Sequence, residues 1–105
     1  MSSSFSAPEL AAHLLQCSPL LLDVREPWEF DICAIDGSVN IPMGQIPQRL
    51  DELPTSAEIV VICHHGVRSQ QVIWFLRNQS LGDLVNLEGG VDAWARSVDP
   101  AMPVY

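Results

Sequence analysis

The feature that most constrains the fold is a short apolar run, residues 59–62 (IVVI), that ends at a cysteine. All four residues are β-branched and uncharged, which predicts a short strand buried on both faces. Strands of this kind occur in parallel sheets that helices cover on both sides. A helix is predicted soon afterwards, over residues 69–79, with Val72, Phe75 and Leu76 on one face. A strand that leads through a short loop into a helix is the unit of an α/β fold.

The rest of the chain repeats this alternation. Ser6 and Glu9 form a capping-box pattern that opens a helix predicted over residues 7–16. Further strands or extended segments are predicted over residues 20–24, 39–41 and 84–87, and short helices over 27–30, 46–53 and 91–96. The pattern predicts one α/β domain over residues 1–105, with a mainly parallel central sheet and helices on both faces. Residues 1–5 are expected to be partly frayed.

Charge and cysteine content narrow the function classes. The 105 residues carry a net charge of -8, and all five cationic residues are Arg, so the surface repels phosphate backbones and no nucleic-acid partner is expected. No apolar stretch approaches the ~20 residues that span a membrane, and the start of the chain does not resemble a signal peptide. We therefore expect a cytoplasmic protein without membrane contact. Three cysteines do not make a disulfide framework, so free thiols are expected.

Residues 63–69 (CHHGVRS) hold the chemistry that the sequence offers. Cys63 follows the buried strand, and ligands gather at the carboxyl ends of strands in open α/β sheets. The helix start beyond it presents free N–H groups and a partial positive charge, which favour the nucleophilic thiolate. Gly66 lets the loop curl so that N–H groups converge on an anion, and Arg68 adds a fixed positive charge. The alternative is a buried strand cysteine followed by an ordinary turn.

Four segments together resemble one known family. The pattern Cys63-x-x-Gly66-x-Arg68-Ser69 resembles the active-site loop of single-domain rhodaneses, which are thiosulfate or persulfide sulfurtransferases. Residues 23–30 (DVREPWEF), 37–42 (GSVNIP) and 87–94 (LEGGVDAW) are similar to that family's DVRE…E(F/Y), G-A-x-N-I-P and L-x-G-G-x-x-A-W segments. The segments follow the family's order over residues 6–104. One departure is that the family often has Gly-His before the G-A-x-N-I-P segment, where this chain has Cys33-Ala34.

The resemblance implies a reaction. The Cys63 thiolate would take a sulfane sulfur from thiosulfate or a persulfide donor, and a thiol or cyanide would then remove it. The implied site is Cys63 as the catalytic residue, with an anion-binding loop formed by His64, His65, Gly66, Val67, Arg68 and Ser69. The implied partners are a small anionic sulfur donor and a thiol or cyanide acceptor, or a protein that donates or accepts sulfur. No cofactor is expected apart from the covalent persulfide on Cys63.

Two alternatives to a sulfurtransferase stay open at this point. The domain could be a sulfur carrier or binding module that acts only with a protein partner, or a phosphatase or arsenate reductase on the same fold. Four residues separate Cys63 from Arg68, whereas the phosphatase signature has five, so the tighter loop favours a single sulfur over a phosphate. Arg68 either recruits the anionic donor or pins the loop to Glu29 or Asp23.

The remaining polar and aromatic side chains receive structural interpretations. His64 and His65 either act on an anionic substrate and on Cys63 or simply point to solvent. Two adjacent histidines with one thiol match no recognised zinc spacing, so no metal is expected. Asp23, Arg25 and Glu29 are expected to form an ion-pair network beneath the loop. The expected buried side chains are Trp74, Trp94, Cys17 and Cys33.

Overall fold

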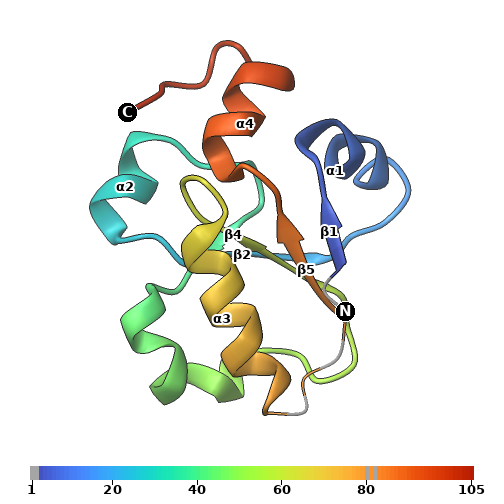
Figure 1. The fold of residues 1–105 in the computed structure, drawn as a ribbon, viewed down its shortest axis with the longest axis vertical. Helices are drawn as coiled ribbons and strands as arrows, with labels where there is room; N and C mark the ends of the chain where they lie inside the picture. Colours follow the sequence, from blue (N-terminus) through green and yellow to red (C-terminus); the bar gives the residue numbers. More distant parts are fainter. Residues whose placement is uncertain (1–2, 80, 82) are drawn as a thin grey trace.

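A computed structural model of the chain describes residues 3–79, 81 and 83–105. Strands and helices alternate along the chain, as the sequence predicts (Figure 1). The elements are β1 (Ser3–Phe5), α1 (Ala7–His13), β2 (Leu20–Asp23), α2 (Pro27–Ile32), β3 (Val39–Asn40), the 3-10 helix η1 (Met43–Glu52), β4 (Ile59–Ile62), α3 (Val67–Arg77), β5 (Leu84–Leu87) and α4 (Gly90–Ser97).

Among the described residues, five strands form one sheet in the order β1-β5-β4-β2-β3, and neighbouring strands run parallel. The run that dominates the sequence, residues 59–62, is the central strand β4, between β2 and β5. All four of its residues are fully buried. The predicted α/β fold with a parallel sheet is confirmed.

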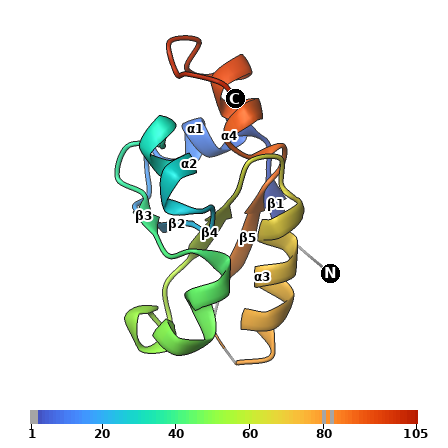
Figure 2. The ribbon, with the colours of Figure 1, turned by 90° about the vertical axis from the view of Figure 1, so that its left-hand side faces the viewer.

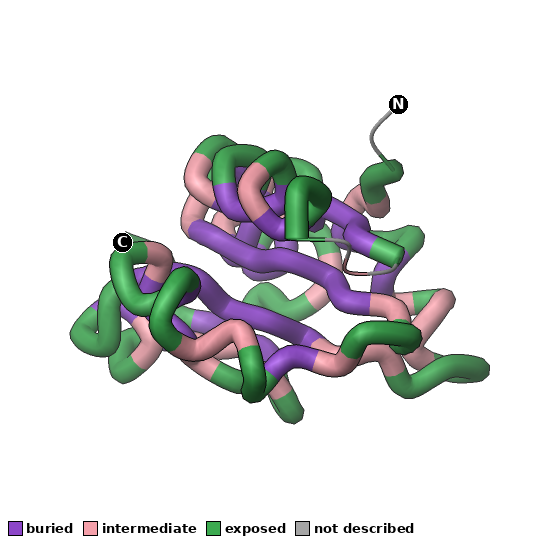
Figure 3. Tube along the Cα trace, turned by 90° about the horizontal axis from the view of Figure 1, so that it is seen from below, coloured by how far each residue is buried: buried purple, intermediate pink, exposed green. Residues whose placement is uncertain are grey.

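Helices cover both faces of the sheet (Figure 2). Val60 and Ile62 of β4 belong to a core cluster with residues of α1 and α4, whereas Ile59 and Val61 belong to a second cluster with residues of η1 and α3. Successive residues of a strand point to opposite faces, so one short strand supplies both cores. The buried strands lie in the middle of the molecule, between exposed turns of the helices (Figure 3).

Three local predictions were wrong. Ser3–Phe5 are not frayed but form the edge strand β1 beside β5; residues 1 and 2 lie outside the described residues. Trp74 is 70% exposed, because it lies two positions from both Val72 and Leu76 and so faces away from the core. Cys17 is exposed, since it follows the end of α1.

The helix bounds also differ from the predicted ones. The first helix ends at His13 rather than residue 16, and α3 begins at Val67, two residues early. The segment predicted over residues 46–53 is a 3-10 helix that begins at Met43 and contains Pro47. Among the described residues, no helix is long and apolar enough to cross a membrane.

Candidate functional site

The loop after β4 places Cys63 beside the N-terminus of α3. Gly66 precedes the helix with φ +100°, a conformation that side chains other than glycine rarely adopt, and this turns the loop back toward the cysteine. The backbone N–H of Gly66 donates to Cys63 Sγ at 2.9 Å. The first N–H groups of α3 have no intrahelical carbonyl to bind and follow directly in the chain. Cys63 is 1% exposed, so its sulfur lies inside this loop rather than on an open surface.

The start of α4, at Gly89 and Gly90, supports the loop from the other side. The N–H of Val91 donates to the Cys63 carbonyl at 2.9 Å, and the N–H of Asp92 donates to the His64 carbonyl at 3.1 Å. Gly90 has φ +60°, and a Cβ there would lie 2.2 Å from the Cys63 carbonyl oxygen. The close approach of the two backbones therefore requires glycine, which accounts for the LEGG pattern.

Ser69 and Asn86 form a buried polar pair behind the sulfur. Ser69 Oγ lies 3.5 Å from Cys63 Sγ and also donates to Oδ1 of Asn86, on β5. The hydroxyl can turn from Asn86 toward the sulfur when the thiol loses its proton. Asn86 was missed by sequence analysis, although a polar residue inside the apolar run 84–87 was a usable signal.

Arg68 is paired within the protein. Its two terminal nitrogens donate to the two carboxylate oxygens of Glu29 at 2.7 and 2.8 Å. The hydrogen bond from Arg68 lowers the pKa of Glu29 to about 2, although burial alone would raise it. Of the two roles that the sequence left open, this geometry matches the pinning of the loop to Glu29.

Of the predicted network of Asp23, Arg25 and Glu29, the structure forms one ion pair, between Arg25 and Asp23, whereas the Glu29 carboxylate pairs with Arg68. Arg25 and Asp23 are fully buried, and Arg25 Nη2 donates to Asp23 at 2.7 Å and to the Cys33 carbonyl at 2.6 Å. Burial opposes the charge on Arg25, but hydrogen bonds to Asp23 and Tyr105 raise its pKa overall. Among the described residues, every buried side-chain nitrogen and oxygen has a hydrogen-bond partner.

Tyr105 joins these groups to the loop. Its hydroxyl accepts from Arg25 at 2.9 Å and donates to Glu29 at 2.8 Å, while its ring stacks on His64 at 4.0 Å between centroids. Burial raises the pKa of Tyr105 to about 12, so the phenol keeps the proton that it donates. No local pattern in the sequence singled out this residue, because its partners are far away along the chain.

We expect Tyr105→Phe to lower the free energy of unfolding by about 1 kcal/mol. The substitution removes one hydroxyl, but Arg68 still holds Glu29 and the ring still covers His64. Chemical denaturation of both proteins measures the difference. Unchanged stability would show that the hydroxyl contributes nothing net to the network.

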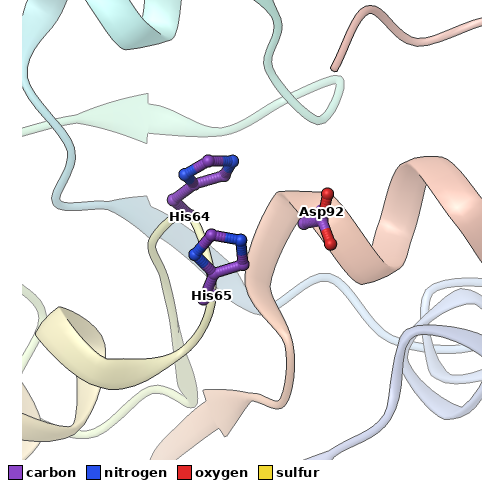
Figure 4. Close-up of side chains that lie close together, drawn as sticks. All are labelled: His64, His65 and Asp92. Atoms are coloured by element: carbon purple, nitrogen blue, oxygen red, sulfur yellow. The ribbon is translucent and has the colours of Figure 1, made fainter. Parts of the chain in front are cut away.

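The rings of the two loop histidines, which follow Cys63 in the chain, pack against each other at a tilt of 30°. Their ring centroids lie 3.9 Å apart, and Asp92 of α4 lies beside them (Figure 4). Burial and the neighbouring His65 lower the pKa of His64, which favours its neutral form. Val67 is exposed, so its side chain faces solvent. Of the predicted loop residues, the structure thus places Gly66 and Ser69 against the Cys63 sulfur, whereas Arg68 binds Glu29 and Val67 faces solvent.

Fold and site define a class of protein. A parallel α/β sheet presents a cysteine within a curled loop of backbone donors, which is the arrangement of a protein that handles an anion on a thiol. The family model described as "Rhodanese-like domain" matches residues 6–97 of the sequence. The chain therefore belongs to the rhodanese-like domain family.

Similar proteins agree with this assignment. A protein of Allochromatium vinosum named "Sulfurtransferase" is 40% identical over 77 residues, which cover 73% of this chain and 72% of that protein. A Zea mays protein named "Adenylyltransferase and sulfurtransferase MOCS3-1" is 38% identical over 93 residues, covering 82% of this chain but only 20% of that protein. The crystal structure of a rhodanese-like domain protein from Staphylococcus aureus has a TM-score of 0.84 at 32% identity, with 100% and 99% of the two chains covered. These relatives support sulfur transfer in general.

Proposed function

We propose that this domain is a rhodanese-type sulfurtransferase that carries a sulfane sulfur as a persulfide on Cys63. The observation that carries the proposal is the Gly66 N–H at 2.9 Å from Cys63 Sγ, at the head of α3. A persulfide adds one negatively charged sulfur to this position, and backbone N–H groups are suited to hold such a charge.

The chemistry is two displacements at sulfur. The Cys63 thiolate attacks the outer sulfur of thiosulfate, the S–S bond of the donor breaks, and sulfite leaves with the bonding electron pair. Cyanide or a thiolate then attacks the outer sulfur of the Cys63 persulfide, which releases thiocyanate or a new persulfide and restores the Cys63 thiolate. Charge and atoms balance in both steps, and no external oxidant or reductant is required.

The electrostatics support a backbone role in holding the negative charge of the donor and the persulfide. The net charge of -8 opposes the approach of an anionic donor. Arg68 is already engaged by Glu29, and Arg25 by Asp23, so neither guanidinium is an uncommitted cation. The N–H groups of residues 64–69 are therefore the groups proposed to hold the donor and the persulfide.

The test compares two donors on the same preparation. Turnover of thiosulfate and cyanide, with Cys63 labelled by one added sulfur in a peptide mass spectrum, would support the enzyme. No labelling by thiosulfate, but labelling by the persulfide of a partner sulfurtransferase, would instead favour the carrier that acts only with a protein. The carrier is a candidate because Cys63 is 1% exposed and because some relatives are about five times longer than the matched domain.

We expect no phosphatase activity from this loop. The sulfur already accepts the Gly66 N–H within a loop of four residues between Cys63 and Arg68, whereas a tetrahedral phosphate must be held by three oxygens at once. Misplacing a reacting atom by about 1 Å costs ~100-fold. An aryl phosphate assay beside the thiosulfate assay checks this. Phosphate release at a comparable rate, lost in Cys63→Ser, would contradict it.

A further inference from the structure

The outer side of the loop holds three metal-ligating side chains that the sulfur chemistry does not use. One ligand atom from each of His64, His65 and Asp92 lies within 4.8 Å of the others. The two histidines come from the Cys63 loop, and the carboxylate comes from the first turn of α4 (Figure 4). We propose that these residues form a binding site for a late divalent transition metal ion such as Zn²⁺, and that the bound ion obstructs access to Cys63.

The donor set fits this class of ion. Imidazole nitrogen suits Zn²⁺, Cu²⁺ and Ni²⁺, whereas Mg²⁺ and Ca²⁺ prefer sites made of oxygen alone. Two histidines and one carboxylate leave a fourth position to water, as in an open zinc site. The negative charge of the whole protein, -8, attracts a divalent cation, whereas it repels an anionic donor.

Binding of an ion requires the ligand atoms to approach one another and a histidine ring to turn, because the in-plane lone pairs of two nearly parallel rings do not meet at one point. Zn–N and Zn–O bonds of about 2.0–2.2 Å place two ligand atoms ~3.4 Å apart on a tetrahedral ion, so ligand atoms that lie within 4.8 Å of one another need to approach by at most roughly 1.4 Å. The ring centroids of the two histidines lie 3.9 Å apart with their planes tilted by 30°, and His65 is exposed, so its ring can turn toward solvent. The backbones are already fixed to each other, because the Asp92 N–H donates to the His64 carbonyl at 3.1 Å.

Two existing contacts affect the proposed metal site. One competes with the ion for Asp92, and the other holds the His64 ring in place. Arg96 donates to Oδ2 of Asp92 at 3.0 Å, but Arg96 is exposed and such a pair contributes little, and the carboxylate has a second oxygen. Tyr105 stacks on His64 at 4.0 Å and restricts the ring that the ion would use. The result is one ring held in place and two donors able to close around an ion.

The position of the site gives it a consequence for sulfur transfer. His64 follows Cys63 directly in the chain, and the carbonyls of both residues are held by α4. An ion that joins the loop to Asp92 would tie the loop to α4 a second time, one residue away from a cysteine that is already 1% exposed. This part of the proposal rests on the proposed function, but the binding of the ion does not.

Binding is tested in a protein that lacks the reactive thiol. Tag-free Cys63→Ser protein is titrated with Zn²⁺ by calorimetry, and one ion per chain is expected. Adding Asp92→Asn or His65→Ala should raise Kd by more than ~100-fold, because losing even an outer partner of a ligand costs 10–100-fold. Glu52→Gln is the matched control, since Glu52 also pairs with an exposed Arg, Arg49, away from the site, and its Kd should not change. No binding, or equal loss in the control, would overturn the site.

The obstruction is tested separately with the Cys63 thiol present. The rate at which thiosulfate adds sulfur to Cys63 is followed by mass spectrometry without cyanide, because cyanide itself binds Zn²⁺. Zn²⁺ should slow this step, and Asp92→Asn should need a much higher Zn²⁺ concentration for the same effect. Equal sensitivity of the two proteins would show that Zn²⁺ acts on the thiol alone. If the protein takes no sulfur from any donor, the proposed function fails while the calorimetric result stands.

Discussion

Replacing Cys63 with serine is expected to abolish sulfur transfer from thiosulfate, with a loss of at least ~10³-fold in kcat. The loss is large because the nucleophile forms the covalent intermediate, and removing a nucleophile of this kind costs up to about 10⁶-fold in other enzymes. The serine hydroxyl still fits the loop, since Cys63 is a small buried side chain between Ile62 and the turn. Stability should therefore change far less than activity, and circular dichroism with thermal melting checks this.

The other two cysteines provide the controls for Cys63. Cys17 is exposed and lies beyond α1, so Cys17→Ser should leave turnover unchanged. Cys33 is buried, and its carbonyl accepts from Arg25 within the network, so no donor is expected to reach its thiol. After incubation with thiosulfate, peptide mapping should place the added sulfur on Cys63 alone. Sulfur on Cys17 or Cys33, or full turnover by Cys63→Ser, would contradict the assignment of the nucleophile.

The local part of the site was predictable because its determinants are adjacent in the chain. The run 59–62 predicts a strand, Cys63 follows it, and Gly66 provides the left-handed turn before α3. These relations depend on side-chain branching and backbone conformation, which act over a few residues. The sheet followed as well, because buried parallel strands leave little choice of fold.

The partners across the fold were less predictable. Arg68 meets Glu29 from 39 positions away, and Tyr105 meets Glu29 from 76 positions away. Such pairs depend on how α2, α3 and the last residues pack, and no periodic pattern reports that packing. Sequence analysis limited the partner of Arg68 to Glu29 or Asp23, but Tyr105 and Asp92 were not connected to the site at all.

Trp74 is an error of a different kind. Its position two residues from Val72 and two from Leu76 places it on the outer face of α3, so helical periodicity alone contained the correct answer. The large apolar side chain was given more weight than its position on the helix. Residue type is a weak guide to burial, because much of any folded surface is apolar.

Arg68→Ala is expected to lower the free energy of unfolding at pH 7 by about 2 kcal/mol, between the values for exposed and for fully buried ion pairs. Glu29 is nearly fully buried, and Arg68 supplies a hydrogen bond to each of its two oxygens. Losing Arg68 leaves that carboxylate with the Tyr105 hydroxyl and the Glu26 N–H as partners. Solvent reduces the effect, because the Arg68 side chain is 31% exposed.

Arg49→Ala is the matched control for this prediction. Arg49 also binds a glutamate through two nitrogens, with distances of 2.7 and 2.9 Å to Glu52, but this pair lies on the surface of η1. Exposed pairs of the same geometry contribute little, because water competes for both partners. Denaturation of the two variants in parallel therefore separates burial from geometry. Equal losses for Arg68→Ala and Arg49→Ala would contradict a structural role for Arg68.

The pH dependence of stability provides a second test of the Arg68–Glu29 pair. The pKa of Glu29 is lowered from an ordinary value of 4.5 to about 2, chiefly by the Arg68 hydrogen bond. A lowered pKa in the folded state means that the pair stabilises the protein above pH ~4.5 and that this stability is lost as the pH falls toward 2. Glu29→Gln has no carboxylate to protonate, so its stability should fall less between pH 5 and pH 2. Identical pH profiles for Glu29→Gln and the unmodified protein would show that Glu29 is not held in its charged form.

The Arg68→Ala variant also distinguishes between the two roles of Arg68. If Arg68 recruits the donor, Arg68→Ala should keep its stability and lose roughly tenfold or more in kcat/KM for thiosulfate, because a charged hydrogen bond contributes ~1.5–3 kcal/mol. If Arg68 pins the loop, the loss appears in stability, and kcat/KM per folded molecule changes less. The second result is expected, because two guanidinium nitrogens are already bound to Glu29 and the donor would have to displace a carboxylate to reach them.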